Sequence, residues 1–136
     1  MSKVENPESR AWMIAEVALV PGVKQVIVFS GDGLLLASSE GMDRDSADRL
    51  SASCAGLQSL ARSLGREFGE DGGTVHQQMV EFNGGYLFMR SSKGAHLAVV
   101  TGPVVDPKLV ARQMQAQVMK IGATHLTSPA RLETTP

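Results

Sequence analysis

The stretch VIVFSGDGLLLASS, residues 26–39, places two strongly apolar runs on either side of Gly31-Asp32-Gly33. A glycine-bracketed aspartate near a strand end can belong to a phosphate loop, a metal loop or a tight turn. A phosphate loop leads into a helix and carries Lys followed by Ser or Thr, whereas three leucines follow Gly33. A calcium loop needs further carboxylates at alternating positions. The stretch is therefore predicted to be a β-hairpin with a tight or bulged turn.

The composition is that of a single globular domain. The chain has 136 residues, of which 43% are hydrophobic and 20% charged, and its formal charge is −1. A duplex-binding protein normally carries an excess of Lys and Arg, so no nucleic-acid partner is expected. No apolar run approaches the roughly 20 residues that span a bilayer, so direct membrane insertion is not expected. The N-terminal residues lack a signal sequence and the single cysteine permits no internal disulfide, which together predict a cytoplasmic location.

Helical periodicity appears near the N-terminus and again over residues 42–69. Asn6-Pro7 is a plausible helix start, and apolar residues recur at helical spacing until Pro21-Gly22. That first pattern is made by Trp12, Ala15 (or Met13 and Val17) and Leu19. The second helix opens with Asp43 or Asp45, and its exposed side offers the i,i+4 pairs Arg44–Asp48 and Asp45–Arg49. Its predicted core-facing seam is Ala47, Leu50, Cys54, Leu57, Ala61 and Leu64.

Three further strands and a last helix complete the predicted domain. TVHQQMVEF, YLFMR and HLAVV are strands joined by glycine-containing turns, and Asp106-Pro107 starts a helix that Gly122 ends. The order is α-β-β-α-β-β-β-α. The first and fifth strands are almost wholly apolar, which predicts central positions, while the polar third strand predicts an edge. We expect an α/β (α+β) fold with a five-stranded antiparallel sheet of order 2-1-5-4-3 and helices on both faces. Residues 8–122 form the domain, between a flexible N-terminus (1–7) and a flexible tail (123–136).

The edge strand and a second stripe on the long helix predict self-association. A long edge is an aggregation hazard unless it is covered, and pairing with its own copy under closed two-fold symmetry removes the hazard. Small side chains let a second helix approach closely, although the same residues would also suit a solvent-facing helix surface. The stripe consists of Arg49, Ala52, Ser53, Gly56, Ser59 and Ser63.

Four segments in this order resemble the Roadblock/dynein light chain family: PGVKQVIVFSGDGLLLASS, DSADRLSASCAGLQSLARSLGREF, VHQQMVEFNGGYLFM and AHLAVV. The likeness is closest to bacterial members encoded beside a sensor histidine kinase-like protein and a small Ras-like GTPase, the conservon arrangement. The resemblance implies a profilin-like fold and a homodimer in which third strands pair and long helices lie side by side. It also implies a platform for a small GTPase, in some members one that helps its hydrolysis.

The resemblance carries over to the long helix, residues 45–66, and to the edge strand. His76 and His96 depart from the ordinary strand residues expected at their positions, so the local interface chemistry is expected to differ from that of the family. The edge-strand residues assigned to the dimer interface are His76, Gln77, Gln78, Met79, Val80, Glu81 and Phe82.

No catalytic constellation is visible. Cys54 lies on the apolar seam, and the three histidines (His76, His96 and His125) show no zinc-binding spacing, so neither metal nor cofactor is expected and the chain is predicted not to be an enzyme. GEDGGT lacks the residues of a nucleotide loop. An arginine of the long helix could stabilise charge in a partner's GTPase site, although solvated arginines are commoner. The partner-binding candidates are Arg44, Asp45, Asp48, Arg62 and Arg66.

Two functions remain open at this point. The leading hypothesis is a non-enzymatic, homodimeric signalling module that binds a small Ras-like GTPase, together with a sensor kinase, and is recruited to membranes only through partners. The alternative is a small-molecule sensor, which would need a cavity between the sheet and a helix with convergent polar groups. The interior residues identified from the sequence are apolar and favour a filled core.

Overall fold

The computed structural model describes residues 7–126, and side chains from residue 10 to residue 123. The predicted element order is confirmed, with a short 3-10 helix added in front of the first α-helix. The elements are η2 (Pro7–Met13), α1 (Ala15–Ala18), β1 (Val23–Ser30), β2 (Leu35–Ser38), α2 (Arg44–Phe68), β3 (Gln77–Phe82), β4 (Gly85–Ser92), β5 (Ala95–Thr101) and α3 (Pro107–Leu126). The predicted cap at Asn6, most of the predicted tail and the side chain of His125 lie outside the described part.

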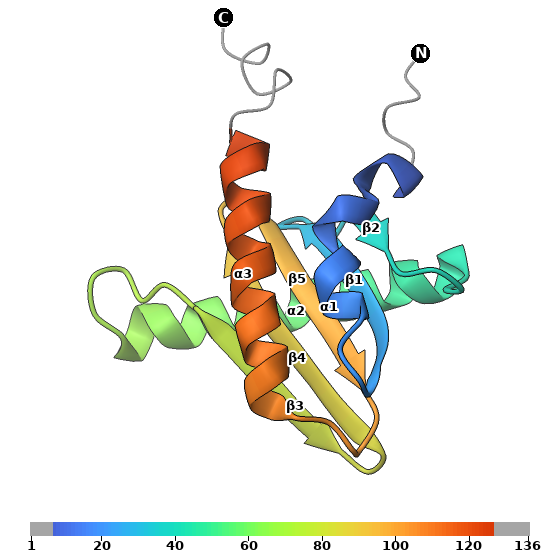
Figure 1. Cartoon of the computed structure of the whole chain (residues 1–136). Coiled ribbons are helices and arrows are strands. Elements are labelled where there is room, and N and C mark those ends of the chain that lie inside the picture. Colours follow the sequence, from blue (N-terminus) through green and yellow to red (C-terminus); the bar gives the residue numbers. More distant parts are fainter. Residues whose placement is uncertain (1–6, 127–136) are drawn as a thin grey trace, which may run out of the picture.

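The five strands form one sheet in the order β2-β1-β5-β4-β3, as predicted. All neighbouring strands are antiparallel. The central strands β1 and β5 are buried along most of their length, because helices cover the sheet on both faces. In Figure 1, α1 and α3 lie in front of the sheet and α2 crosses behind it. β3 lies at one edge of the sheet.

Each layer of helices encloses its own apolar core. Alternate side chains of a strand point to opposite faces, so Val28 packs toward α1 and α3 while its neighbour Ile27 packs toward α2. Met114 of α3 belongs to the first core, and Cys54 of α2 belongs to the second. The predicted face of α3 is confirmed, since Val110, Met114, Val118 and Ile121 are buried and Leu109 packs against them.

The Gly31-Asp32-Gly33 segment is a hairpin turn, as predicted. The hydroxyl of Ser30 accepts a hydrogen bond from the Leu34 amide at 3.1 Å and donates one to the Asp32 carboxylate. The Ser30 amide donates to the Leu34 carbonyl at 2.9 Å, and Gly33 adopts a φ of 89° that favours glycine. The pairing of β1 with β2 shifts register beside the turn, which is the expected bulge.

The first helix is broken, contrary to the prediction of one continuous helix. Arg10, within η2, has a φ of −113° and is not helical, and α1 is only four residues long. The buried Gln117 side chain of α3 accepts from the Glu16 and Val17 amides at 3.1 and 3.4 Å and donates to the Trp12 carbonyl at 3.0 Å. Gln117 thus satisfies backbone groups at the break. Leu19, which was predicted to continue the apolar face, is 83% exposed because α1 ends before it.

Three further boundaries and faces differ from the predictions. The fully buried face of α2 is Ala47, Ser51, Cys54 and Gln58, whereas the predicted seam residue Leu64 is exposed. Ser51 satisfies its hydroxyl by donating to the Gly33 carbonyl at 2.6 Å. Helix α3 continues past Gly122 to Leu126. β3 begins at Gln77 rather than Thr74, although the His76 carbonyl still accepts from the Ser91 amide at 3.4 Å.

Candidate interaction surface at the open sheet edge

The edge strand β3 is paired on one side only, with β4. Its side chains alternate between the two faces of the sheet. Gln78 points toward α2, since its amide donates to Gln58 of α2 at 3.0 Å, and Val80 and Phe82 follow on the same face. Met79, Val80 and Phe82 are 59%, 37% and 46% exposed, so the strand presents apolar side chains beside unpaired backbone groups. An edge of this kind is a template for another strand.

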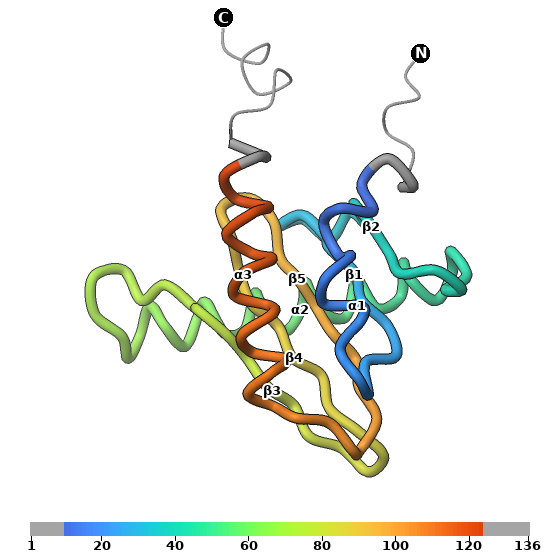
Figure 2. Tube along the Cα trace, in the orientation of Figure 1, coloured from blue at the N-terminus to red at the C-terminus, as the bar shows by residue number. Residues whose placement is uncertain are grey.

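The end of α2 projects beyond this edge. Figure 2 shows the trace of α2 and of residues 69–76 extending past β3 before the chain returns to the sheet. Leu60, Leu64 and Phe68 recur every four residues, so they form a row along one side of this part of the helix. They are 67%, 60% and 75% exposed. We call the set Leu60, Leu64, Phe68, Val80 and Phe82 the apolar border.

The predicted stripe of small residues lies on the outward side of α2, and Leu60, four residues after Gly56, borders it. Arg49, Ala52, Ser53, Gly56, Ser59 and Ser63 are all exposed. Helical spacing places Gly56 about half a turn away from the buried residues Ala47 and Cys54. A β-carbon added at Gly56 would meet no atom within 4 Å. The stripe therefore points away from the sheet and is open to a partner.

The five charged partner-binding candidates fall into two groups. Arg44, Asp45 and Asp48 lie in the first turns of α2, where Arg44 and Asp48 form the predicted ion pair at 3.1 Å. The predicted Asp45–Arg49 pair does not form within residues 10–123, because the Arg49 guanidinium donates to the Ser46 hydroxyl instead. Asp43 is the helix cap, and the backbone hydrogen bond from Ser46 lowers its pKa. Arg62 and Arg66 lie roughly 27 Å farther along the helix axis.

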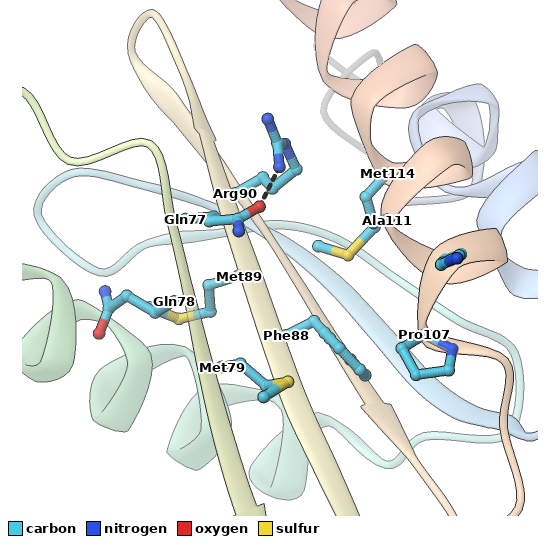
Figure 3. A pocket seen from close by; sticks show the side chains of 10 residues that line it. Gln77, Gln78, Met79, Phe88, Met89, Arg90, Pro107, Ala111 and Met114 are labelled. Carbon is cyan, nitrogen blue, oxygen red and sulfur yellow. Dashed lines mark hydrogen bonds between the residues drawn. The ribbon is translucent and has the colours of Figure 1, made fainter.

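A groove of about 240 Å³ separates the edge strand from the start of α3. Figure 3 shows Met79 and Phe88 on the sheet side, facing Pro107 and Met114 of α3. The Arg90 guanidinium, held by a hydrogen bond to Gln77, lies at one end. Most of the lining is apolar, and the remaining lining residues are Gln78, Met89, Lys108 and Ala111. The groove is the cavity between sheet and helix that the small-molecule alternative requires, but it offers few polar groups.

Cys54, the candidate nucleophile, is buried in the core between the sheet and α2. Burial raises the pKa of Cys54 to about 11, so the thiol stays protonated at neutral pH. Among the described residues no cluster of three His, Cys, Asp or Glu side chains could hold a metal ion. His76 precedes β3 and is exposed, whereas His96 is buried in β5.

No described helix combines the length and apolar character needed to cross a membrane.

Several important residues were missed from the sequence. Gln58 and Gln117 are buried polar side chains, and nothing in the local pattern separates them from surface residues. Leu60 and Phe68 were also missed, although their spacing from Leu64 was readable. The 25 residues of α2 span about 37 Å, more than the roughly 24 Å across five strands, so the sequence indicates that part of this helix projects beyond the sheet but not which end.

The fold and the open edge define the class of protein. A five-stranded antiparallel sheet of order β2-β1-β5-β4-β3, covered by helices on both faces, is a profilin-like architecture. The chain belongs to the Roadblock/LC7 domain family, whose family model matches residues 12–101. The resemblance of the four sequence segments to this family is thereby confirmed.

Solved structures agree with this assignment. The chain is 36% identical to a Roadblock/LC7 domain from Streptomyces avermitilis, with a TM-score of 0.78, covering 85% of this chain and 96% of that chain. An MglB structure with tetrameric arrangement has 16% identity and a TM-score of 0.75, covering 87% and 89%. Profilin IB from Acanthamoeba castellanii has 17% identity and a TM-score of 0.55, covering 82% and 97%, and shares the fold. No curated protein matches the sequence significantly.

Proposed function

We propose that the chain is a non-enzymatic, homodimeric regulatory module that binds a small Ras-like GTPase in a signalling complex with a sensor histidine kinase-like protein. Family membership and the resemblance to bacterial members encoded beside such proteins support this function. The main observation that supports a dimer is the apolar border beside the unpaired edge of β3. The module works in the cytoplasm and reaches membranes through its partners. Its effect on GTP hydrolysis acts through the GTPase's switch loops rather than through chemistry of its own.

The two copies pair through β3 and lie with their α2 helices side by side. Exposed leucine and phenylalanine on the part of α2 beyond the sheet have no cover within residues 7–126. A two-fold axis perpendicular to the sheet brings the second α2 next to the first on the same face. Leu64 and Phe68 then face the copy, the small-residue stripe points outward, and Leu60, four residues after Gly56, lies at the border between the two surfaces. We therefore assign the row to the dimer contact, and we assign the stripe, which the sequence placed in the dimer interface, to the GTPase.

The symmetry restricts how the strands pair. Directly opposite residues in antiparallel strands point to the same face of the sheet. Because the proposed axis keeps the faces matched, one residue must lie opposite its own copy, and the centre of β3 offers Met79 or Val80. Opposite α-carbons are about 4.5–5.5 Å apart, a separation that a disulfide can bridge.

Single-cysteine cross-linking tests this pairing. We expect either Met79→Cys or Val80→Cys to form a covalent dimer under mild oxidation, with the favoured position identifying the axis. Cys54 is the single natural cysteine and is fully buried, so it does not compete. Leu34→Cys, at a 64% exposed turn position, is the control and should remain monomeric on a denaturing gel. Failure of both edge variants, or equal linkage of the control, refutes β3 pairing.

Binding of the GTPase is tested at the stripe. Gly56→Leu should abolish capture of a small Ras-like GTPase, because the added side chain fills the outward face of α2. The fold tolerates it, since no atom lies within 4 Å of the added β-carbon. A pull-down with the GDP and GTP-analogue forms, and a hydrolysis assay, separates an activator from a scaffold. Normal capture by Gly56→Leu would refute the assignment of the stripe.

The second candidate function, a small-molecule sensor, rests on the groove between β3, β4 and α3. Its volume of about 240 Å³ is below the range of about 300–1,000 Å³ typical of ligand sites. A thermal-shift screen against metabolites tests it, with Ala111→Trp as the variant that fills the groove. A hit whose effect persists in Ala111→Trp would not belong to this groove.

A further inference from the structure

A second cavity, of about 310 Å³, lies between α2 and the turn that joins β4 to β5. Its walls come from three places: the last turns of α2, the loop after α2, and the adjoining ends of β4 and β5. We call it the arginine pocket. It is lined by Gln58, Arg62, Arg66, Gly72, Gly73, Thr74, Val75, Ser91, Ser92 and His96.

The charged groups that line the arginine pocket are cationic. Arg62 and Arg66 are one helical turn apart, and neither forms an ion pair with a carboxylate of residues 10–123. Arg66 donates to the Ser63 hydroxyl at 3.4 Å. The nearby acids Glu70 and Asp71 line a different hollow, which does not include either arginine. Arg62 and Arg66 thus line one cavity, and its lining includes no carboxylate.

His96 forms the inner wall of this pocket. Its Nδ1 is 3.0 Å from the Ser91 hydroxyl, and its ring lies 5.2 Å from that of Phe29. Burial and the positive charge of Arg62 lower the pKa of His96. A neutral imidazole keeps one N–H donor, and Arg62 is the charged group that acts on it among the described residues. The wall therefore supplies donors without adding a third charge.

Glycines fix the outer wall. A β-carbon on Gly73, whose φ is 67°, would lie 1.9 Å from the Gly65 carbonyl oxygen. One on Gly65 would lie 2.1 Å from the Gly73 carbonyl oxygen. The loop can therefore pack directly on the backbone of α2 only because both positions lack a side chain. On this side the pocket is bounded by backbone.

We propose that the arginine pocket binds the phosphate group of a small phosphorylated ligand. Guanidinium groups match the tetrahedral oxygens of phosphate with two donors each, and two of them balance a dianion. The hydroxyls of Ser91 and Ser92 supply further donors at the inner wall. A monoanionic carboxylate would leave one guanidinium uncompensated. This proposal assigns Arg62 and Arg66, which the sequence offered as partner-binding candidates, to the ligand rather than to the GTPase.

The binding test uses inorganic phosphate and NMR. Titration at constant ionic strength, balanced with chloride, should give saturable shifts at the side-chain signals of Arg62, Arg66 and His96. Bound phosphate offsets the charge of Arg62, so the pKa of His96 should rise toward its ordinary value. Arg62→Gln and Arg66→Gln should each weaken binding about tenfold, as expected for loss of one charge-assisted interaction. Arg49→Gln, on the outward face of the same helix, should change it less than twofold.

Two further measurements distinguish a small phosphorylated ligand from a lipid headgroup, and distinguish the phosphate proposal from the proposed dimer. Glycerol 3-phosphate should compete with inorganic phosphate, whereas retention of the protein on phosphatidic acid vesicles but not on phosphatidylcholine ones would assign the site to a lipid headgroup and overturn the small-ligand proposal. Leu64→Gln, designed to disrupt the dimer, should bind phosphate normally. Unsaturable shifts, or equal weakening by Arg49→Gln, would refute the pocket.

Discussion

The substitution Leu64→Gln separates folding from dimerisation. Leu64 is 60% exposed in the single chain, on the row of α2 that extends beyond the sheet. Glutamine has nearly the helix propensity of leucine and a similar length, so α2 should form as before. A change at an exposed helix position alters the free energy of unfolding by about 0.5 kcal/mol or less. The fold of the monomer should therefore survive.

The effect on the dimer follows from the area that remains to be buried. Complete burial of a leucine side chain is worth about 1.5–3 kcal/mol, and the exposed part of Leu64 accounts for about 1–2 kcal/mol of this. A two-fold contact contains the residue twice, which doubles the loss to about 2–4 kcal/mol. The dimer dissociation constant should rise roughly thirty-fold to several hundred-fold.

Sedimentation velocity over a dilution series measures this shift. The control is Leu19→Gln, which changes a leucine that is 83% exposed at the end of α1, on the opposite face of the sheet. The melting temperature gives a second readout, since dimerisation makes it rise with protein concentration. The wild-type and Leu19→Gln proteins should show that rise, and Leu64→Gln should not. An unchanged dissociation constant in Leu64→Gln would refute the proposed arrangement of the helices.

Three further predictions concern the interior and the loop after α2. Gln117→Leu should lower the free energy of unfolding in urea by about 2–4 kcal/mol, because three backbone groups near α1 lose their partner, whereas Gln113→Leu should cost less than 1 kcal/mol. Cys54 should resist alkylation at pH 8. Burial raises the pKa of Cys54 from 9.0 to about 11, so the thiol loses its proton at a lower pH in the unfolded chain than in the folded one. The free energy of unfolding should therefore fall as the pH rises from 9 to 11, and Cys54→Ala should remove this contribution. Gly73→Ala should destabilise the loop more than Gly72→Ala, as measured by faster amide hydrogen exchange. Both glycines have positive φ, but only a β-carbon at Gly73 would meet a carbonyl of α2.

The fold was readable from the sequence because its signals are local. Apolar runs separated by glycine turns define β1 to β5, and their polarity places β1 and β5 in the centre. Asp43 and Asp106 mark helix starts, since both carboxylates accept backbone amides of the following turn. The break between η2 and α1 was not readable, because the group that satisfies it, Gln117, is about a hundred residues away.

The candidate surfaces were only partly readable for the same reason. Periodicity places Arg49 and Gly56 on one stripe and shows that β3 is polar enough for an edge. It cannot show that Leu64 lies beyond the last strand, because the position of a helix over a sheet is a tertiary property. The arginine pocket was also hidden, since Arg62 and His96 come from elements that are far apart in the sequence.

The two edges of the sheet explain why self-association should stop at a dimer. η2 packs against β2, and the Arg10 guanidinium donates to the Leu36 carbonyl of that strand at 3.2 Å. β3 has no such cover within the described chain, and a net charge of −1 gives little repulsion between copies. A chain with two open edges could extend into a fibre. In a chain with a single open edge, one symmetric contact between two copies pairs that edge completely, and no open edge remains. The covered β2 edge is therefore as necessary to a closed dimer as the apolar border beside β3.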